Sequence, residues 1–342
     1  MNFKGIDLCC PHCRGELDGQ IDAAGEGALH CPECRRTYPV ILGIPDLRLF
    51  PDPYIDFEAD RAKGRKVAAH LHDGSFADLV SYYYSITPVV PPHHARQYTR
   101  GLLAAAARAE AELAAWEKMA GDNRTGGSLL EIGCGTGPLL VAAAGRYDQV
   151  VGVDIAFRWL VVAKKRLMEA GLDLPLICAC AEALPFAAPA FDRVAADSVL
   201  EHLHDQRQAL AEIRRVMRPG GWFFALTPNR YSLGPDPHTG IWAGGYLPDR
   251  WTAAIVRRQG GIPPRRRLLS TRGLARLVRE AGFTRVRIQL PDVPEGQRAH
   301  FGPAMRRLID GYHLAKRLPA GRQILGLVGP LLQVVAMLEI GD

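Results

Sequence analysis

The sequence predicts an α/β fold in which a small cofactor lies against the main chain, preceded by a small metal-stabilised module. The segment SLLEIGCGTGPLLVAAAG starts with an apolar run, continues with three glycines in five positions and ends in an apolar helical pattern, which indicates a strand, a tight turn and a helix. A second strand, QVVGVD, ends in Asp154, 17 residues after Gly137. Two C-x-x-C pairs near the start of the chain predict the metal-stabilised module.

Length and composition set limits on the function. The chain has 342 residues, of which 48% are hydrophobic, so it can bury a sizeable core around one large domain and smaller additions. Its formal charge of +6 suits an anionic ligand or surface but is low for a dedicated nucleic-acid protein. The opening MNFKGIDLCCPHC lacks the basic-then-apolar pattern of a signal peptide, so we expect a cytoplasmic protein.

The glycine turn distinguishes between classes of cofactor. Glycine permits positive φ and lets a ligand lie against the backbone, and an acidic residue at the tip of the next strand accepts hydrogen bonds from ribose hydroxyls. A dinucleotide fingerprint reads G-x-G-x-x-G, whereas this chain has Gly133, Gly135 and Gly137 as G-x-G-x-G, preceded by Glu131. The carboxylate of Glu131 would repel a pyrophosphate but suits a cationic sulfonium or ammonium group.

The pattern EIGCGTG resembles the first motif of the class I S-adenosylmethionine-dependent methyltransferases. Residues 176–205, with the turn LPF, and residues 209–228, with the turn PGG, resemble later motifs of that family in the same order. The resemblance implies a Rossmann-like, mainly parallel seven-stranded sheet with helices on both faces. It also implies S-adenosylmethionine as the cofactor and methyl transfer as the reaction.

The resemblance assigns roles to individual residues. Gly133, Gly135 and Gly137 would line the methionine and ribose, with Glu131 nearby, and Asp154 would hold the ribose diol. The remaining roles concern the adenine and the methionine: Ile155 would flank adenine, Ala181 would offer backbone to its edge, and Asp197 and Ser198 would lie beside the methionine. Cys180 is a departure, because relatives often carry Asp there and Cys is a weak acceptor. Glu182 could take over that contact.

The N-terminal module, residues 1–50, has the spacing of a zinc ribbon. Cys10 and Cys13 form one knuckle and Cys31 and Cys34 the other, so four thiolates can surround Zn²⁺ tetrahedrally. Such a closed site is structural, and the metal would supply folding energy to a module too small to fold alone. Three further residues remain as alternative ligands: Cys9, His12 and His30. The ending TYPVILGIPDLR resembles the zinc-ribbon proteins that bind and activate methyltransferases.

The rest of the chain divides into a helical or lid segment at 51–125 and a methyltransferase domain at 126–342. We expect a helix at 100–121, a helix in TRGLARLVREAGF, a strand at 284–290 and a closing antiparallel strand in LLQVVAML. Two insertions are expected, at about 229–269 for the substrate and at about 291–330. The apolar stretch 324–338 is too short and too broken to span a bilayer, so a buried strand with its lead-in is expected, with peripheral membrane contact as an alternative.

Methyl transfer to a hydroxyl calls for a general base, and the sequence leaves several classes of acceptor possible. A hydroxyl acceptor needs a group that takes its proton, and the candidates are His202 and His204, after the fourth strand, and His238, in the substrate loop. We expect His202 first and His238 second, with catalysis by positioning alone, without a base, as the alternative. Trp242, Tyr246 and Trp251 favour a small-molecule, glycan or natural-product acceptor, because aromatic rings stack on such faces. Arginines from 250 to 287 and the zinc ribbon leave RNA as an alternative acceptor. A non-catalytic, cofactor-binding adaptor is the third reading.

Overall fold

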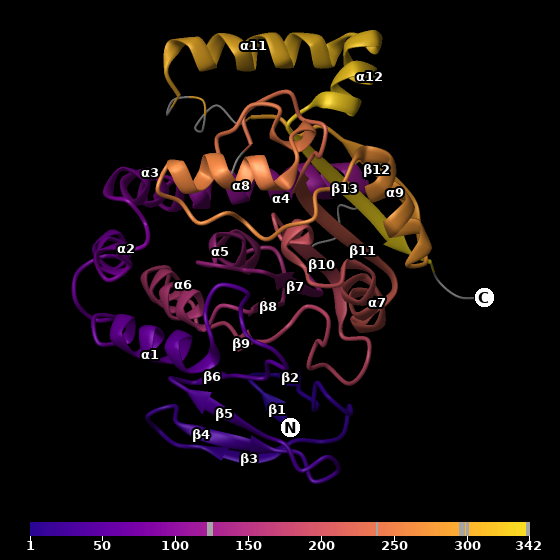
Figure 1. Ribbon diagram of the computed structural model, residues 1–342. Helices are drawn as coiled ribbons and strands as arrows, with labels where there is room; N and C mark the ends of the chain where they lie inside the picture. Colours follow the sequence, from indigo (N-terminus) through magenta and orange to yellow (C-terminus); the bar gives the residue numbers. More distant parts are fainter. Residues whose placement is uncertain (122–125, 237–238, 294–297, 299–300, 340–342) are drawn as a thin grey trace.

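A seven-stranded sheet forms the centre of the protein (Figure 1). The computed structural model describes residues 1–121, 126–236, 239–293, 298 and 301–339. In that part of the chain the strands lie in the spatial order β12-β13-β11-β10-β7-β8-β9. Strand β13 runs antiparallel to β11 and β12, and the other pairings are parallel. The strands are β7 (Ser128–Ile132), β8 (Gln149–Asp154), β9 (Leu176–Cys178), β10 (Phe191–Asp197), β11 (Met217–Pro228), β12 (Phe283–Gln289) and β13 (Leu331–Leu338).

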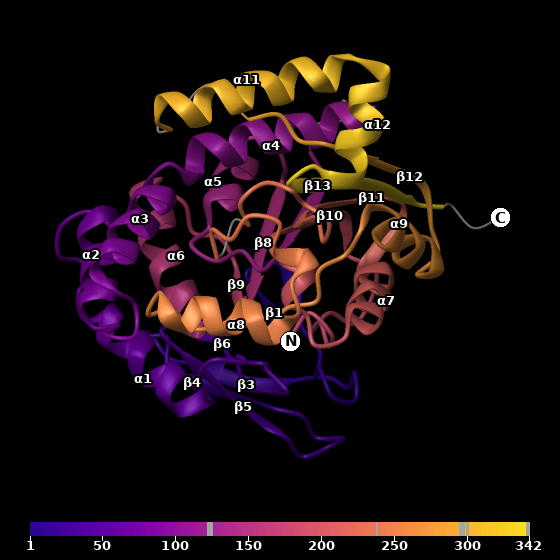
Figure 2. The same ribbon diagram turned by 45° about the horizontal axis from the view of Figure 1, so that its top comes forward.

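Helices cover both faces of the sheet, as the sequence predicts (Figures 1 and 2). One face packs against α4 (Ala105–Ala120), α5 (Pro138–Ala144) and α6 (Phe157–Glu169). Outside them lie α1 (Phe57–Ala68), α2 (Phe76–Ser85) and α3 (Pro92–Leu103). The opposite face packs against α7 (Gln206–Val216) and α9 (Thr271–Glu280). The predicted α/β fold class is therefore confirmed.

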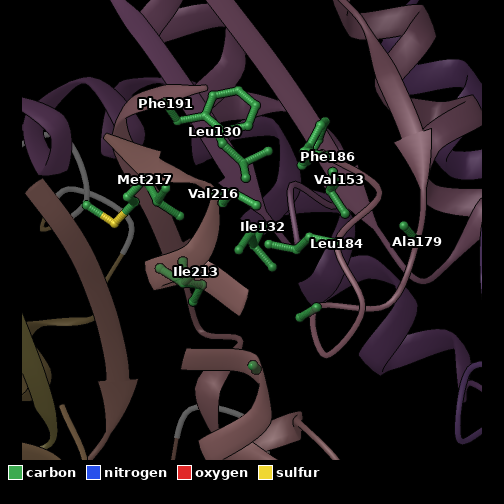
Figure 3. Close-up of a cluster of buried hydrophobic side chains, with 14 of the residues drawn as sticks. Leu130, Ile132, Val153, Ala179, Leu184, Phe186, Phe191, Ile213, Val216 and Met217 are labelled. Carbon is green, nitrogen blue, oxygen red and sulfur yellow. The ribbon is translucent and has the colours of Figure 1, made fainter. Parts of the chain in front are cut away.

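Strand alternation directs side chains into these two layers. Leu130 and Ile132 of β7 point into the layer that also holds Ile213 of α7 and Phe191 (Figure 3). Leu129, one position earlier, packs in the layer of α4 and α5. Because successive residues of a strand face opposite sides, Glu131 projects toward α4 and α5.

The N-terminal ribbon packs on the edge of this sheet at β9. Its strands are β1 (Asn2–Phe3), β2 (Ile6–Asp7), β3 (Asp18–Ile21), β4 (Gly27–His30), β5 (Thr37–Ile41) and β6 (Ile44–Pro45). After β6 the chain runs parallel to β9, where the Leu47 amide donates to the Cys178 carbonyl at 2.7 Å. Leu29 and Leu47 of this region belong to the same buried cluster as Leu130. The ribbon and the sheet therefore share one core.

Two expectations about helices need correction. The expected helix 100–121 is divided at Ala104 into the end of α3 and the whole of α4. Helix α4 lies against α5 and β13. The expected lead-in to the last strand is α12 (Pro319–Val328), which follows α11 (Pro303–Arg317) and leaves Ile324 and Leu327 exposed. Pro319 suits the first turn of α12, and Pro330 stops it.

The segment after β11 carries the 3₁₀ turn η2 (Gly244–Tyr246) and the helix α8 (Asp249–Arg258), and a further 3₁₀ turn, η1 (Leu200–His202), follows β10. Throughout the described ranges, the helices all fall short of the length and hydropathy needed to span a bilayer.

Candidate cofactor and metal sites

The glycine turn follows β7 and is held by β8. The Gly133 amide donates to the Val153 carbonyl at 2.7 Å, and Gly133, Gly135 and Gly137 have φ values of +69°, +50° and +73°. A side chain at Gly133 would overlap Val199, so packing alone requires glycine there. At Gly135 a Cβ atom would meet no described heavy atom within 4 Å. The turn therefore leaves open space beside Gly135, where a ligand could lie against the backbone.

Asp154 ends β8 and points into the turn. Its Oδ2 accepts from the Gly135 amide at 2.8 Å, and its Oδ1 accepts from the Ala156 amide at 2.7 Å. Burial raises the pKa of Asp154 to about 6, although the two amide donors act to lower it. Each carboxylate oxygen retains a lone pair for a further donor. This arrangement fits the predicted role of Asp154 toward a ribose diol.

Three carboxyl groups gather on the α4 side of the turn. Glu131 is 3% exposed, and among the described residues its Oε2 has no hydrogen-bond partner. Burial raises the pKa of Glu131 well above its ordinary value, and the carboxyls of Asp197, Asp154 and Glu112 add to the rise. Burial, followed by Asp197, raises the pKa of Glu112 to about 8. A buried carboxyl oxygen without a partner among the described residues, beside other carboxyl groups, fits a cation, so these residues suit the sulfonium of S-adenosylmethionine.

Sequence reasoning missed Glu112. This residue lies on α4, before the glycine motif, and is 14% exposed with Arg108 Nε 3.6 Å from its Oε1. The only local signal is the i,i+4 pair with Arg108, which is typical of any solvated helix. Glu112 enters the site because α4 packs across α5 and the sheet.

Ser198 occupies a strained position after β10. Its φ is +55°, a left-handed conformation that is uncommon for residues other than glycine. The Ser198 amide donates to the Leu226 carbonyl at 2.8 Å, and its hydroxyl donates to Asp197 Oδ1 at 3.0 Å. Asp197 in turn lies among the carboxyl groups around Glu131. Strain of this kind occurs often at functional sites, and the position of both residues beside the methionine stays a prediction.

The residues predicted around adenine contact the segment that follows the ribbon. The Ile155 carbonyl accepts from Arg48 Nη1 at 2.9 Å, and the Cys180 thiol donates to the Phe50 carbonyl at 3.6 Å. Ala181 is buried. Glu182 Oε1 accepts from the His204 amide at 2.8 Å, so this oxygen faces the loop after η1.

A buried network of charges joins this segment to α6, and sequence reasoning also missed it. The Arg48 guanidinium, whose side chain is fully buried, donates to Asp46 Oδ2 and Asp60 Oδ2, each at 2.7 Å. Asp60 also accepts from the Phe157 amide at 2.9 Å and pairs with Arg158. These contacts fix the start of α6, directly after Asp154 and Ile155.

The candidate base His202 lies at the end of η1. Its Nε2 is 3.8 Å from Glu201 Oε1, and its side chain is 31% exposed. Glu201 is fully buried, and its Oε2 accepts from the Thr227 hydroxyl at 2.9 Å. The Glu201 carboxylate is therefore held in a fixed position beside the imidazole. The second candidate, His238, lies outside the described residues.

The four predicted cysteines converge in the ribbon. Within the described ranges, the Sγ atoms of Cys10, Cys13, Cys31 and Cys34 lie within 4.8 Å of one another, in a group that includes neither Cys9 nor the two histidines considered as alternatives. Cys10 and Cys34 are 3.5 Å apart, and Cys13 and Cys31 are 3.4 Å apart. Four thiolates around Zn²⁺ at about 2.3 Å are separated by about 3.8 Å, so the cluster fits a tetrahedral zinc ion.

Comparisons with known proteins match both parts of the chain that hold these candidate sites. The family model described as "Methyltransferase domain" matches residues 130–225, and the one described as "Trm112p-like protein" matches residues 8–43. A ubiquinone biosynthesis O-methyltransferase of Chromobacterium violaceum is 37% identical over 106 residues, which cover 31% of this chain and 46% of the relative. The chain thus spans about half the length of such relatives. A protein of the same name from Burkholderia pseudomallei is 31% identical over 165 residues, 48% of this chain and 67% of the relative.

Among solved structures, a Haemonchus contortus phosphoethanolamine N-methyltransferase 2 with S-adenosylmethionine matches 67% of this chain and 52% of its own, at 19% identity and a TM-score of 0.45. A complex of the Haloferax volcanii Trm112 methyltransferase activator with a putative methyltransferase matches 64% of this chain and 84% of its own, at 18% identity and a TM-score of 0.41. One family assignment follows from the sheet order, the glycine turn and the 31% identity across 67% of the Burkholderia relative. This chain belongs to the class I S-adenosylmethionine-dependent methyltransferase family and carries a Trm112p-like zinc ribbon at its N-terminal side.

Proposed function

We propose that this protein transfers the methyl group of S-adenosylmethionine to an oxygen atom of a small organic acceptor. The observation that carries the proposal is the buried Glu131 Oε2, which has no hydrogen-bond partner among the described residues, beside the open glycine turn, with Asp154 on the other side of that turn. When bound, S-adenosylmethionine supplies an electrophilic methyl group on a positively charged sulfur. The carboxyls of Glu131, Asp197 and Glu112 attract that charge, and Asp154 orients the ribose.

A hydroxyl acceptor loses its proton as the new bond forms. The carbon–sulfur bond breaks, the carbon–oxygen bond forms, and S-adenosylhomocysteine leaves. We assign the proton to His202, because Glu201 holds a fixed carboxylate 3.8 Å from its Nε2. His238 remains the second candidate.

The acceptor class rests on two observations. Several curated relatives are named ubiquinone biosynthesis O-methyltransferases. Another, from Bordetella avium, is named a ubiquinone/menaquinone biosynthesis C-methyltransferase. These names indicate small-molecule acceptors for the relatives. Trp242, Tyr246 and Trp251 are exposed in the segment after β11 and offer flat surfaces to a ring-containing, glycan or natural-product acceptor.

Calorimetric titration with S-adenosylmethionine tests cofactor binding and separates the enzyme from an adaptor. Methyl-labelled cofactor added with the protein to a cell lysate then reports the acceptor. We expect label in extractable small molecules that survives nuclease treatment. Label found only in nuclease-sensitive material would instead identify an RNA methyltransferase, and binding without any label would identify an adaptor.

A matched pair of variants tests the base. His202→Gln should lower kcat for a hydroxyl acceptor by about 10²- to 10⁴-fold without changing cofactor affinity. His204→Gln, at an exposed neighbouring position, should leave both unchanged. If the kcat of His202→Gln equals that of His204→Gln and of the wild type, His202 is not the base.

A further inference from the structure

Exposed apolar side chains concentrate in two segments of the described chain. Of seventeen large hydrophobic residues exposed there, seven lie between 231 and 262 and five between 308 and 327. Trp242, Tyr246 and Trp251 are each more than half exposed, as are Ile324 and Leu327 of α12. Soluble surfaces rarely group so many large apolar side chains, so the segments that contain them indicate an interaction surface. We call these segments, the described residues of 229–268 and 303–328, the docking face.

The two segments are joined through hydrogen bonds. The Leu233 amide donates to the Val328 carbonyl at 3.1 Å, which places exposed Leu233 at the end of α12. The Tyr246 hydroxyl donates to the Tyr231 carbonyl at 3.0 Å, and the two rings lie 5.5 Å apart. Helix α8 begins three residues after Tyr246, and α11 packs on α12. Figure 1 shows α11 and α12 at the top of the molecule, with α8 below them.

The docking face is also strongly basic. Residues 229–268 contain seven arginines and two aspartates, and residues 303–328 contain five basic residues and one acidic residue. The other 276 positions hold 30 basic and 33 acidic residues, so the whole positive excess of the chain falls in these two segments. On α8, exposed Trp251, Ile255 and Arg258 follow the three- and four-residue spacing of one helical face, opposite buried Val256.

This combination identifies one kind of partner. A second copy would bring an equally basic face against this one, and repulsion opposes such a symmetric interface. RNA would use the arginines, but exposed aliphatic side chains such as Leu318, Ile324 and Leu327 offer no face for base stacking. An anionic phospholipid bilayer interacts with the arginines, the aromatic rings and the aliphatic side chains of this face. Its headgroups attract arginine, and its interface accepts Trp, Tyr and aliphatic side chains.

We propose that the docking face binds the surface of an anionic phospholipid bilayer. The face adjoins the candidate reaction site, because the Arg267 amide donates to the Glu201 carbonyl at 2.7 Å and Asn229 bridges to Leu269. If the proposed function holds, docking brings the rim of the His202 site to the membrane, and the acceptor is a molecule carried in the bilayer.

Vesicle flotation of the full chain tests docking without any measurement of activity. The protein should float with vesicles of phosphatidylcholine mixed with phosphatidylglycerol and much less with phosphatidylcholine alone. The double variant Arg257→Gln, Arg258→Gln should bind about 30-fold more weakly, at about fivefold per charge. The variant Trp251→Ser, Ile255→Ser should lose at least about tenfold. Met168→Ser, an exposed apolar residue of α6, is the matched control and should bind as the wild type does.

Three outcomes overturn the proposal: no flotation, equal binding to both kinds of vesicle, or variants that bind like the wild type. Sedimentation that reveals a dimer broken by Trp251→Ser, Ile255→Ser would assign the face to a second copy. Calorimetric titration of each variant with S-adenosylhomocysteine reports the cofactor site separately. A failure of docking is thereby distinguished from a failure of the proposed function.

Discussion

Replacing Gly135 with alanine separates cofactor binding from folding. Gly135 has a φ of +50°, and a Cβ there meets no described heavy atom within 4 Å. An L-residue in this left-handed conformation costs about 1–2 kcal/mol, which lowers the melting temperature by about 2–4 °C per kcal/mol in a domain of this size. With a cofactor against the turn, the extra methyl overpacks the site by about 1–3 kcal/mol, so affinity should fall about 5- to 150-fold.

Calorimetric titration with S-adenosylhomocysteine and a thermal melt measure the two effects. Gly171→Ala is the matched control, because Gly171 has a φ of +69°, also has no neighbour within 4 Å, and lies beyond the far end of α6. Both variants should melt a few degrees lower, and only Gly135→Ala should bind more weakly. Wild-type affinity in a Gly135→Ala protein that melts as expected would show that no cofactor lies against this turn.

Three more predictions concern charge, metal and the ribbon. Burial raises the pKa of Glu112 from 4.5 to about 8, so the stability that its protonated form provides is lost as pH rises through about 8. In urea unfolding, Glu112→Gln should therefore be more stable than the wild type above that pH. The same variant should show a smaller rise of S-adenosylmethionine affinity with pH. Cys31→Ser should contain no zinc by elemental analysis and should bind the cofactor more weakly, whereas Cys9→Ser should match the wild type in both measurements. Arg48→Met removes the buried guanidinium shared by Asp46 and Asp60, which keep Arg61 and Arg158 as partners, so it should cost about 1–3 kcal/mol in urea unfolding, against no measurable change for exposed Arg36→Met. An Arg48→Met protein as stable as the wild type would contradict the role given to the network.

The cofactor turn and the zinc cluster were predictable because their chemistry fixes residue types at short spacings. Gly133, Gly135 and Gly137 are needed for backbone reasons that act within a few residues, and all three have positive φ. Four cysteines in two knuckles are likewise a local pattern, and the structure brings their sulfur atoms together. Local chemistry of this kind is readable from one sequence.

Glu112 and Arg48 were not predictable, because distant packing gives them their roles. Nothing near Glu112 in the sequence distinguishes it from the other acidic residues of an Ala-rich helix; it enters the site only because α4 lies across the sheet. Arg48 reads as one more basic residue after the ribbon, yet its partner Asp60 lies on α1 and Ile155 lies after β8. The division of the expected helix at Ala104 has the same origin, since helix propensity does not set the angle at which a helix must meet the sheet.

The ribbon contacts the candidate cofactor site directly and is not a separate attachment. The segment that leaves it supplies a donor to the Ile155 carbonyl and an acceptor, the Phe50 carbonyl, to the Cys180 thiol. Removing residues 1–50 would leave both groups without these partners, and would take Arg48 from buried Asp60 of α1, which holds the start of α6. Because unpaired buried groups are costly, the folded ribbon and the ordered adenine side stabilise one another. Such coupling is reciprocal: whatever affinity the zinc-bound ribbon adds for the cofactor, the bound cofactor adds equally for zinc.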